Sequence, residues 1–203
     1  MIENQTTERK IIKAAEQVFI EKGLNGTKMS DIAERAGISR TTLNYYYRTK
    51  ENLFYAIIEQ VFDTLLPRLE NLSLLEGDIN SKIDTIVDIY DEMLRKNEYV
   101  PRFVLLEIQR NPNQIHDFVK QNTKAQTYLN ALDIMIGKGM EVGKISKIDK
   151  PQLVSTFFGL IFTPFLLEPL LAMYREPQKE SRNAFLDEHK LIVKKLMKAY
   201  FEE

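Results

Sequence analysis

The chain has 203 residues, with 28 Lys and Arg, 29 Asp and Glu, two His and no Cys. Its hydrophobic content of 44% and charged content of 28% indicate a globular chain rather than a disordered one. The absence of Cys excludes disulfides, thiolate metal sites and a cysteine nucleophile, and two His leave little for metal or acid–base chemistry. We therefore expect no metal, no cofactor and no enzymatic activity.

Neither the N-terminus nor the apolar stretches suggest export or membrane insertion. The first six residues lack a basic start followed by an apolar run, so we expect no signal peptide. The longest charge-free stretch of the C-terminal half, residues 151–167, contains two prolines and is shorter than the ~20 residues of a membrane span. It is more typical of a buried core or interface helix. We expect a cytoplasmic protein that contacts no membrane.

Apolar residues recur at three- and four-residue spacing, and Gly and Pro are scarce, with 8 and 7 residues. This pattern predicts an all-α fold of about nine helices. Gly37 ends the second helix, Thr49 caps the fourth, Pro67 ends it, and Pro164 and Pro169 should bend the eighth. In chain order, the predicted helices cover residues 7–22, 28–36, 39–47, 50–66, 79–96, 101–109, 112–142, 151–174 and 181–203.

Positive charge is concentrated near the N-terminus. Residues 28–50 contain five cationic and two anionic side chains, a net charge of +3, whereas residues 61–203 contain 19 Lys and Arg against 21 Asp and Glu, a net charge of −2. The net charge of −1 is therefore the sum of a basic N-terminal segment and a slightly acidic remainder of the chain. We place a domain boundary between residues 50 and 51, which separates a head of residues 1–50 from a body of residues 51–203.

Two short helices joined by a glycine turn lie within residues 29–47, which is the helix-turn-helix pattern. Gly37 lets the chain reverse, Ala33 and Ala36 let the helices approach, and Leu43 and Tyr47 fix the second helix to the core. Its other face carries side chains of the types that read base edges and hold phosphates, namely Arg40, Thr41, Asn44, Tyr45 and Arg48. The alternative is an ordinary helical hairpin with a polar outer face, which the charge of +3 and three successive Tyr disfavour.

Residues 7–60 resemble the DNA-binding head of the TetR family of bacterial transcriptional repressors. The resemblance rests on Ala14-Ala15, Phe19, Gly23, Thr27, Asp31-Ile32-Ala33, Ala36-Gly37-Ile38-Ser39, Thr42-Leu43, Tyr46-Tyr47 and Lys50-Glu51-Asn52-Leu53. It implies that Thr42, Tyr46 and Lys50 contact phosphates. Thr41 and Asn44 depart from the residues common in the family, so the operator sequence does not transfer. The candidate DNA-binding residues are Lys28, Arg40, Thr41, Thr42, Asn44, Tyr45, Tyr46, Arg48 and Lys50.

The resemblance also implies a dimer, and the last two predicted helices carry surfaces suited to one. Ser155, Gly159 and Thr163 are small residues four apart, so a facing backbone can approach closely. The last helix has apolar and aromatic residues at 4-3-4-4 spacing, namely Phe185, His189, Ile192, Leu196 and Tyr200. A homodimer would form an isologous four-helix contact here. The alternative is that both helices complete the core of the monomer.

The body offers aromatic and apolar residues for a cavity that would suit a lipophilic or planar effector. Glu107 interrupts an apolar run, and it either faces inward, where it could pair with a cation, or lies on a solvated edge. Each of these residues could equally be ordinary core. The candidate ligand-binding residues are Phe62, Tyr90, Met93, Phe103, Glu107, Phe118, Tyr128 and Phe162.

The function that follows is a homodimeric, ligand-responsive repressor that binds a palindromic DNA operator and releases it when a small effector binds. In the TetR family the fourth helix links body to head, so a ligand would tilt the head. The first alternative is a TetR-like DNA-binding protein controlled by a protein partner, or one without a ligand. The second is a helical enzyme with an incidental hairpin, which the shortage of His and Cys disfavours. Repression is implied by the resemblance, and activation stays open.

Overall fold

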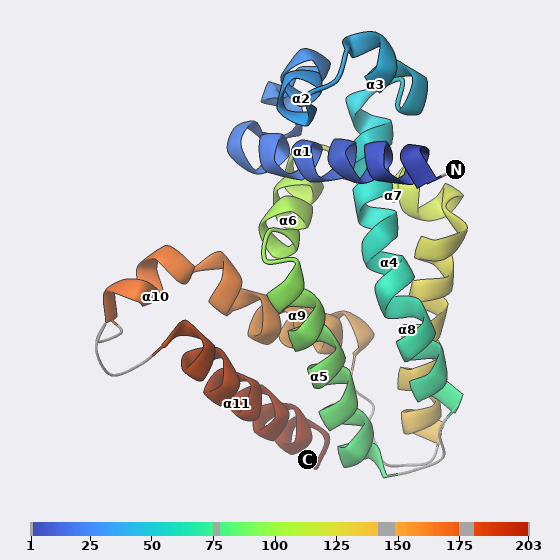
Figure 1. Cartoon of the computed structure of the whole chain (residues 1–203). Helices are drawn as coiled ribbons and strands as arrows, with labels where there is room; N and C mark the ends of the chain where they lie inside the picture. The colour runs from blue at the N-terminus through green and yellow to red at the C-terminus, as the bar shows by residue number, and fades with distance from the viewer. Residues whose placement is uncertain (1, 75–77, 142–148, 175–180, 203) are drawn as a thin grey trace. The chain divides into compact units, whose positions relative to one another are not determined.

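The computed structural model describes residues 2–74, 78–141, 149–174 and 181–202, and this part of the chain forms eleven helices and no strand (Figure 1). The all-α prediction is therefore confirmed. The helices are α1 (Ile2–Gly26), α2 (Met29–Ala36), α3 (Arg40–Tyr46), α4 (Lys50–Leu74), α5 (Ile79–Lys96), α6 (Val100–Arg110), α7 (Pro112–Gln121), α8 (Thr123–Glu141), α9 (Lys150–Leu166), α10 (Glu168–Tyr174) and α11 (Arg182–Glu202).

Two of the predicted helices are each broken in two. The predicted helix 112–142 is interrupted at Asn122, whose N–H donates to the Phe118 carbonyl at 2.8 Å and whose Oδ1 accepts from the Ala125 N–H at 2.9 Å. One residue thus ends α7 and begins α8. The predicted helix 151–174 breaks at Leu167, between the two prolines, and α9 and α10 meet there at 69°. Each proline removes a backbone donor, which explains the predicted bend.

Helix α4 does not end at Pro67, and that prediction was wrong. Pro67 lies inside the helix, which continues to Leu74. A proline in a helix interior costs about 3 kcal/mol. Leu69 and Leu72 follow it and are each only 2% exposed. Burying each leucine contributes roughly 1.5–3 kcal/mol, so their packing offsets the proline.

No single described helix is long and apolar enough to cross a membrane, and only α9 and α10 taken together, across their bend, have the required length and composition.

The chain divides into two compact units. Unit one consists of residues 1–63 and 103–125, and unit two of residues 64–102 and 126–203. Helices α4, α6 and α8 each contribute residues to both. This geometric division differs from the functional boundary expected between residues 50 and 51, which stays a prediction.

Three aromatic rings form the centre of unit one. Phe19 of α1, Phe54 of α4 and Phe103 of α6 contact one another, with ring centroids 4.3 to 6.2 Å apart. Helix α1 continues past Gly23, where the predicted helix ends, but it kinks there with a φ of 68°. A side chain at Gly23 would be strained at this φ and would also collide with the Arg110 guanidinium.

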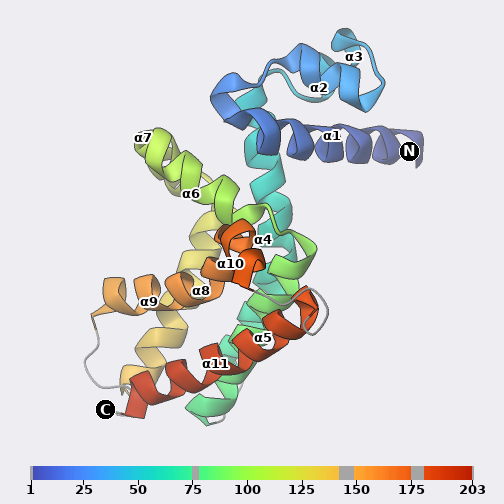
Figure 2. The same cartoon turned by 90° about the vertical axis from the view of Figure 1, so that its left-hand side faces the viewer.

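Unit two has its core between α5, α9 and α11. Helix α11 packs against both α5 and α9 (Figure 2). Each helix presents one buried stripe, as the predicted helical periodicity requires. The stripes include Val87, Tyr90 and Leu94 on α5, Leu153, Phe157 and Ile161 on α9, and Leu186, Val193 and Met197 on α11.

Candidate DNA-binding helix and effector cavity

Local backbone geometry sets the turn between α2 and α3. Gly37 adopts the left-handed conformation with φ 66° and ψ 35°, and the Ile38 N–H donates to the Ala33 carbonyl at 3.0 Å. Nothing lies within 4 Å of a Cβ built at Gly37, so the backbone and not crowding favours glycine here. The Ser39 side chain accepts from the Thr42 N–H at 3.0 Å and caps α3, as predicted.

Helix α3 buries one residue and exposes most of the others. Leu43 is fully buried, whereas Tyr45 is 81% exposed. Thr42 and Tyr46 are half-buried, and the Tyr45 and Tyr46 rings meet edge to face with centroids 5.4 Å apart. The remaining candidate DNA-binding residues of this segment are all exposed, namely Arg40, Thr41, Asn44 and Arg48.

Tyr47 has a structural role next to this face. It lies at the C-terminal end of α3, half-buried, and its hydroxyl donates to Glu8 Oε1 at 2.9 Å. Burial and the Glu8 carboxylate raise the pKa of Tyr47, so its phenol stays protonated. The bond ties the end of α3 to α1.

Two ion pairs join α1 to α2. Lys22 contacts Asp31 at 2.7 Å, and Arg35 contacts Glu21 at 2.5 Å. Hydrogen bonds from Lys22 and from Arg35 lower the pKa values of the Asp31 and Glu21 carboxyls, respectively. The charge of Arg35 is therefore balanced inside the head.

Exposed cations lie around the helix-turn-helix. Lys28, Arg40 and Arg48 form no ion pair with any residue that the structure describes. Because they lie just before α2, at the start of α3 and just after α3, the face around α3 carries uncompensated positive charge. This is the electrostatic footprint that phosphate binding needs.

Lys50 has a partner that the sequence did not reveal. Its Nζ donates to the Leu24 carbonyl at 2.8 Å and to the Asn25 carbonyl at 3.1 Å, at the end of α1. These bonds satisfy carbonyls that a helix end leaves without intrahelical donors. An ammonium has three donors, so one is left for a phosphate. The contact of Lys50 with DNA stays a prediction.

A hollow in unit one carries negative charge, opposite to that of the α3 face. It lies between α4 and α7, encloses about 590 Å³, and its lining includes Glu51, Glu59 and Asp117. The Tyr55 ring stacks on Phe118 within it, with centroids 4.4 Å apart. Burial and nearby carboxylates raise the pKa of Tyr55. This acidic groove would repel a phosphate backbone, which leaves the α3 face as the candidate DNA surface of unit one.

The residues predicted to bind a ligand divide between the two units. Glu107 is 3% exposed and accepts a hydrogen bond from Asn111 Nδ2, so it faces inward rather than lying on a solvated edge. Unit one holds Phe62, Phe103, Glu107 and Phe118, and unit two holds Tyr90, Met93, Tyr128 and Phe162. Their role in ligand binding stays a prediction.

Unit two contains an apolar cavity of about 80 Å³. Of the predicted ligand-binding residues, only Tyr90 is among those that line it. Its hydroxyl bonds to that of Tyr128, and burial raises the pKa of Tyr128 to about 12. The sequence reasoning missed most of the lining, although the 4-3-4 spacing on α5 marks a common helix face. Those residues include Ile79, Ile83 and Ile86 on α5, Phe157 on α9 and Met197 on α11.

The outer faces of α9 and α11 carry the residues predicted for a dimer. Ser155, Gly159 and Thr163 are exposed, and nothing lies within 4 Å of a Cβ built at Gly159. On α11, Ile192 and Leu196 are each 47% exposed. Helix α11 therefore has a buried apolar stripe facing α5 and α9 and a second apolar stripe on the surface.

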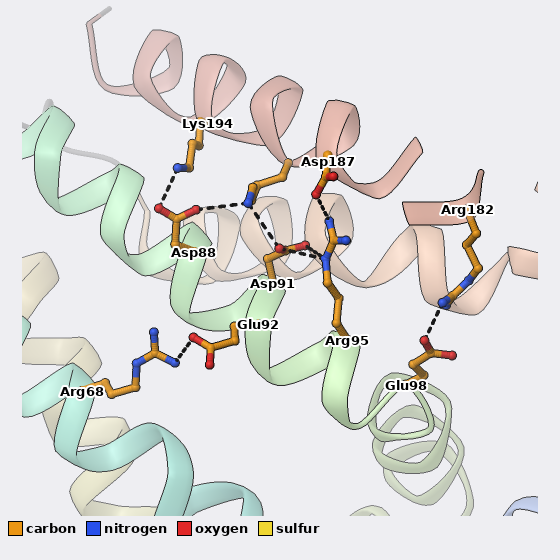
Figure 3. Close-up of polar contacts among 10 residues, drawn as sticks. Arg68, Asp88, Asp91, Glu92, Arg95, Glu98, Arg182, Asp187 and Lys194 are labelled. Atoms are coloured by element: carbon orange, nitrogen blue, oxygen red, sulfur yellow. Dashed lines mark hydrogen bonds and ion pairs between the residues drawn. The ribbon is translucent and has the colours of Figure 1, made fainter. Parts of the chain in front are cut away.

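Charged side chains hold α11 on α5. Asp88 contacts Lys194 at 2.8 Å and Arg95 contacts Asp187 at 2.8 Å (Figure 3). The further pairs are Asp84 with Lys198 at 2.7 Å and Asp91 with Lys190 at 3.6 Å. We call these four pairs the α5–α11 ladder. Along α5 the ladder has three aspartates followed by Arg95. The residues that face them on α11 are three lysines followed by Asp187.

Comparison with known proteins agrees with this geometry. Residues 11–57 match the family described as "Bacterial regulatory proteins, tetR family". These residues contain both helices of the helix-turn-helix and the start of α4.

Longer similarity extends into the body. The chain is 23% identical over 152 residues to the fatty acid metabolism regulator protein of Bacillus subtilis (strain 168), covering 74% of this chain and 77% of that protein. It is 28% identical over 148 residues to the HTH-type transcriptional regulator RutR of Escherichia coli (strain K12), covering 71% of this chain and 66% of that protein.

A solved structure shares the fold over nearly the whole length. The transcriptional regulator FadR from Bacillus subtilis, in complex with stearoyl-CoA, superposes with a TM-score of 0.67 at 20% identity, covering 91% of this chain and 96% of that one. The matched residues thus assign the helix-turn-helix head to the tetR family of bacterial regulatory proteins, and the chain as a whole has the fold of a solved transcriptional regulator.

Proposed function

We propose that the chain is a homodimeric repressor that binds a palindromic operator through α3 and releases it when a small lipophilic effector binds unit two. The observation that carries this proposal is the exposed face of α3, where Arg40 and Asn44 are exposed while Leu43 is buried, and Arg48 is exposed just after the helix. Arg forks onto guanine and Asn onto adenine in the major groove. Lys28, Thr42, Tyr46 and Lys50 would hold phosphates on either side, which would fix the position of α3.

A dimer would place two such helices on one duplex. The exposed apolar residues of α11 and the small residues of α9 support an isologous contact through these helices. Recognition helices of a dimer read half-sites about one turn of duplex apart, roughly 34–36 Å. A small change in their separation would then cost most of the specific affinity. Helix α4 contributes residues to both units, which makes it the candidate element for passing such a change to the head.

The effector is supported by the apolar cavity in unit two and by a relative that was solved with stearoyl-CoA. The small volume of that cavity, about 80 Å³, favours the alternative of a protein partner or no ligand, because drug-sized ligands occupy roughly 300–1,000 Å³. The small-molecule hypothesis and the protein-partner hypothesis predict different results. A small molecule that lowers operator affinity of the purified chain supports the first, and control that needs another protein supports the second.

Selection of duplexes from a random pool by the full chain tests the DNA-binding proposal. We expect an inverted repeat whose half-site centres are about one helical turn apart. Asn44→Ala and Arg40→Ala should each relax preference at one position per half-site, at a cost of about 1–3 kcal/mol there. The exposed Lys195 lies on α11, so Lys195→Ala is the matched control and should keep the full preference. Recovery of no duplex, or unchanged preference in both α3 variants, would contradict the proposal.

A further inference from the structure

The cavity of unit two combines apolar walls with one charged residue. Ile83 and Ile86 of α5 and Phe157 of α9 are typical of its lining, and Lys82 is the lining residue that carries a charge. Tyr90 also borders the cavity, but its hydroxyl is already bonded to Tyr128. The cavity surface is almost entirely apolar, so a ligand inside it would meet hydrocarbon, with the Lys82 side chain at its border.

Lys82 has no counter-charge in the part of the chain that the structure describes. The acidic side chains near it on α5 are engaged elsewhere, since Asp84 pairs with Lys198 at 2.7 Å and Asp78 accepts from the Asn80 N–H at 3.2 Å. Lys82 is half-buried. A lysine in such a position packs its stem on apolar side chains and keeps its ammonium in water at the rim. This arrangement can accept an anion whose apolar end lies in the cavity.

The volume limits the size of that apolar end. A dry cavity of about 150 Å³ is large enough for benzene, so the 80 Å³ present here suits roughly three or four carbon atoms. The cavity is partly open, and Val154 in its lining is 38% exposed. A short ligand can thus enter without displacing the core.

We propose that unit two binds a short, branched aliphatic carboxylate, with its hydrocarbon end in the cavity and its carboxylate on the Lys82 ammonium. This inference rests on the proposed function and names the class of its effector. The charge of Lys82 selects an anion over an amine, and the cavity volume selects short chains over long ones. The charge-assisted bond to the carboxylate gives the acid an advantage over the corresponding alcohol.

Calorimetric titration of the full chain tests the proposal with 3-methylbutanoate, 3-methylbutan-1-ol, 3-methylbutan-1-amine and octadecanoate as probes. We expect saturable binding of 3-methylbutanoate and at least tenfold weaker binding of the other three. Lys82→Gln should weaken carboxylate binding at least tenfold, whereas Lys195→Gln, which removes an exposed lysine outside the cavity, should leave it unchanged. Val154→Phe fills the cavity from its rim and should abolish binding with Lys82 still present.

Several results would overturn the inference. They are the absence of carboxylate binding, equal binding of the alcohol, tighter binding of octadecanoate, or full carboxylate affinity in Lys82→Gln. Affinity for the selected duplex, measured without any ligand, tests the proposed function separately. A chain that binds its duplex but no carboxylate keeps the DNA-binding function and loses this inference. A chain that binds the carboxylate without releasing its duplex keeps the site and loses its role as an effector site.

Discussion

Two polar side chains in this protein form hydrogen bonds that could not be predicted from their residue types. Lys50 combines a predicted DNA contact with hydrogen bonds to two carbonyls at the end of α1. Tyr90 is 1% exposed, and the hydroxyl of Tyr128 is its hydrogen-bond partner. In both cases a polar group is satisfied by a partner far along the chain. The cost of removing either residue therefore depends on what its partner loses.

Lys50→Met should destabilise the chain by about 1–2 kcal/mol, because two α1 carbonyls lose a charged donor. Lys28→Met is the matched control, since Lys28 is exposed and forms no ion pair with a described residue. It should change stability by less than about 0.5 kcal/mol. Urea denaturation followed by circular dichroism measures both.

The two lysine variants also separate stability from DNA binding. If both side chains contact phosphates, each substitution should reduce the slope of log affinity against log salt by about one. A Lys50→Met chain with wild-type stability would contradict the contact with the α1 carbonyls. An unchanged salt slope would contradict the phosphate contact instead.

Tyr128→Phe should cost about 1–3 kcal/mol, because it leaves the buried Tyr90 hydroxyl without this partner. The double variant Tyr90→Phe with Tyr128→Phe should cost less than the sum of the two single changes. Denaturant titration of all four proteins gives the coupling energy. Additive costs would show that the two hydroxyls do not interact.

The same pair predicts a loss of stability in alkali. Unfolded tyrosines ionise near pH 10, whereas burial raises the pKa of Tyr128 to about 12 in the folded chain. Between these values the folded state binds more protons, so the contribution is complete below about pH 10 and is lost as the pH rises towards 12. Denaturation midpoints at pH 9, 10 and 11 should fall more steeply for the wild type than for the double phenylalanine variant.

At the scale of helices, charge order fixes how α11 lies on α5. The α5–α11 ladder pairs three aspartates with three lysines and then reverses sign at Arg95 and Asp187. A shift of α11 by one turn would place a like-charged pair at the reversal. Each partly exposed pair contributes little alone, typically ~0–1 kcal/mol. The ladder therefore contributes mainly by fixing the position of α11 along α5. This position in turn decides which α11 residues stay exposed for a partner.

Asp84→Lys should destabilise the chain by about 1 kcal/mol, because it sets two ammonium groups against each other across the helices. Combining it with Lys198→Asp should restore most of that loss, and 0.5 M salt should reduce both effects. Glu188→Lys reverses an exposed charge on α11 outside the ladder and is the control, with an effect below about 0.5 kcal/mol. Thermal denaturation at low and high salt measures these changes, and a double variant no better than Asp84→Lys alone would contradict the pairing.

At the scale of the whole molecule, the surfaces proposed for DNA recognition and for assembly are different. The candidate DNA-binding helix belongs to unit one, and the exposed apolar residues of α9 and α11 belong to unit two. Leu191, Ile192 and Leu196 leave 62%, 47% and 47% of their surfaces exposed in a single chain. Covering such a stripe would supply apolar burial for association. Association through this stripe would require no contact between the two DNA-binding heads.

Leu191→Glu with Leu196→Glu should convert the proposed dimer into a monomer, because each carboxylate would have to be desolvated in the interface. The monomer should keep its helical content, because both positions are exposed in the single chain. It should bind an isolated half-site as the wild type does and lose the added affinity of the full inverted repeat. Sedimentation velocity gives the mass, and a double variant that still sediments as a dimer would place the interface elsewhere.

Much of the head could be predicted from the sequence, because its determinants act over short distances along the chain. A glycine with positive φ ends α2, a serine caps α3, and Leu43 is buried four residues after its cap. Each of these features is decided within about one helical turn. The break at Asn122 is also local, but a single asparagine between two helical patterns is a weak signal and was missed.

By itself, the sequence determined the all-α class, the helix-turn-helix and the exposed polar face of α3. Only the tertiary structure decided that Lys50 bonds to α1, that Glu107 is buried, that the predicted ligand residues divide between two units, and that α4 runs through Pro67. The physical reason is the range of the interactions. Caps and periodicity are satisfied between near neighbours in the chain, whereas burial, ion pairs between helices and cavities depend on contacts between segments tens of residues apart.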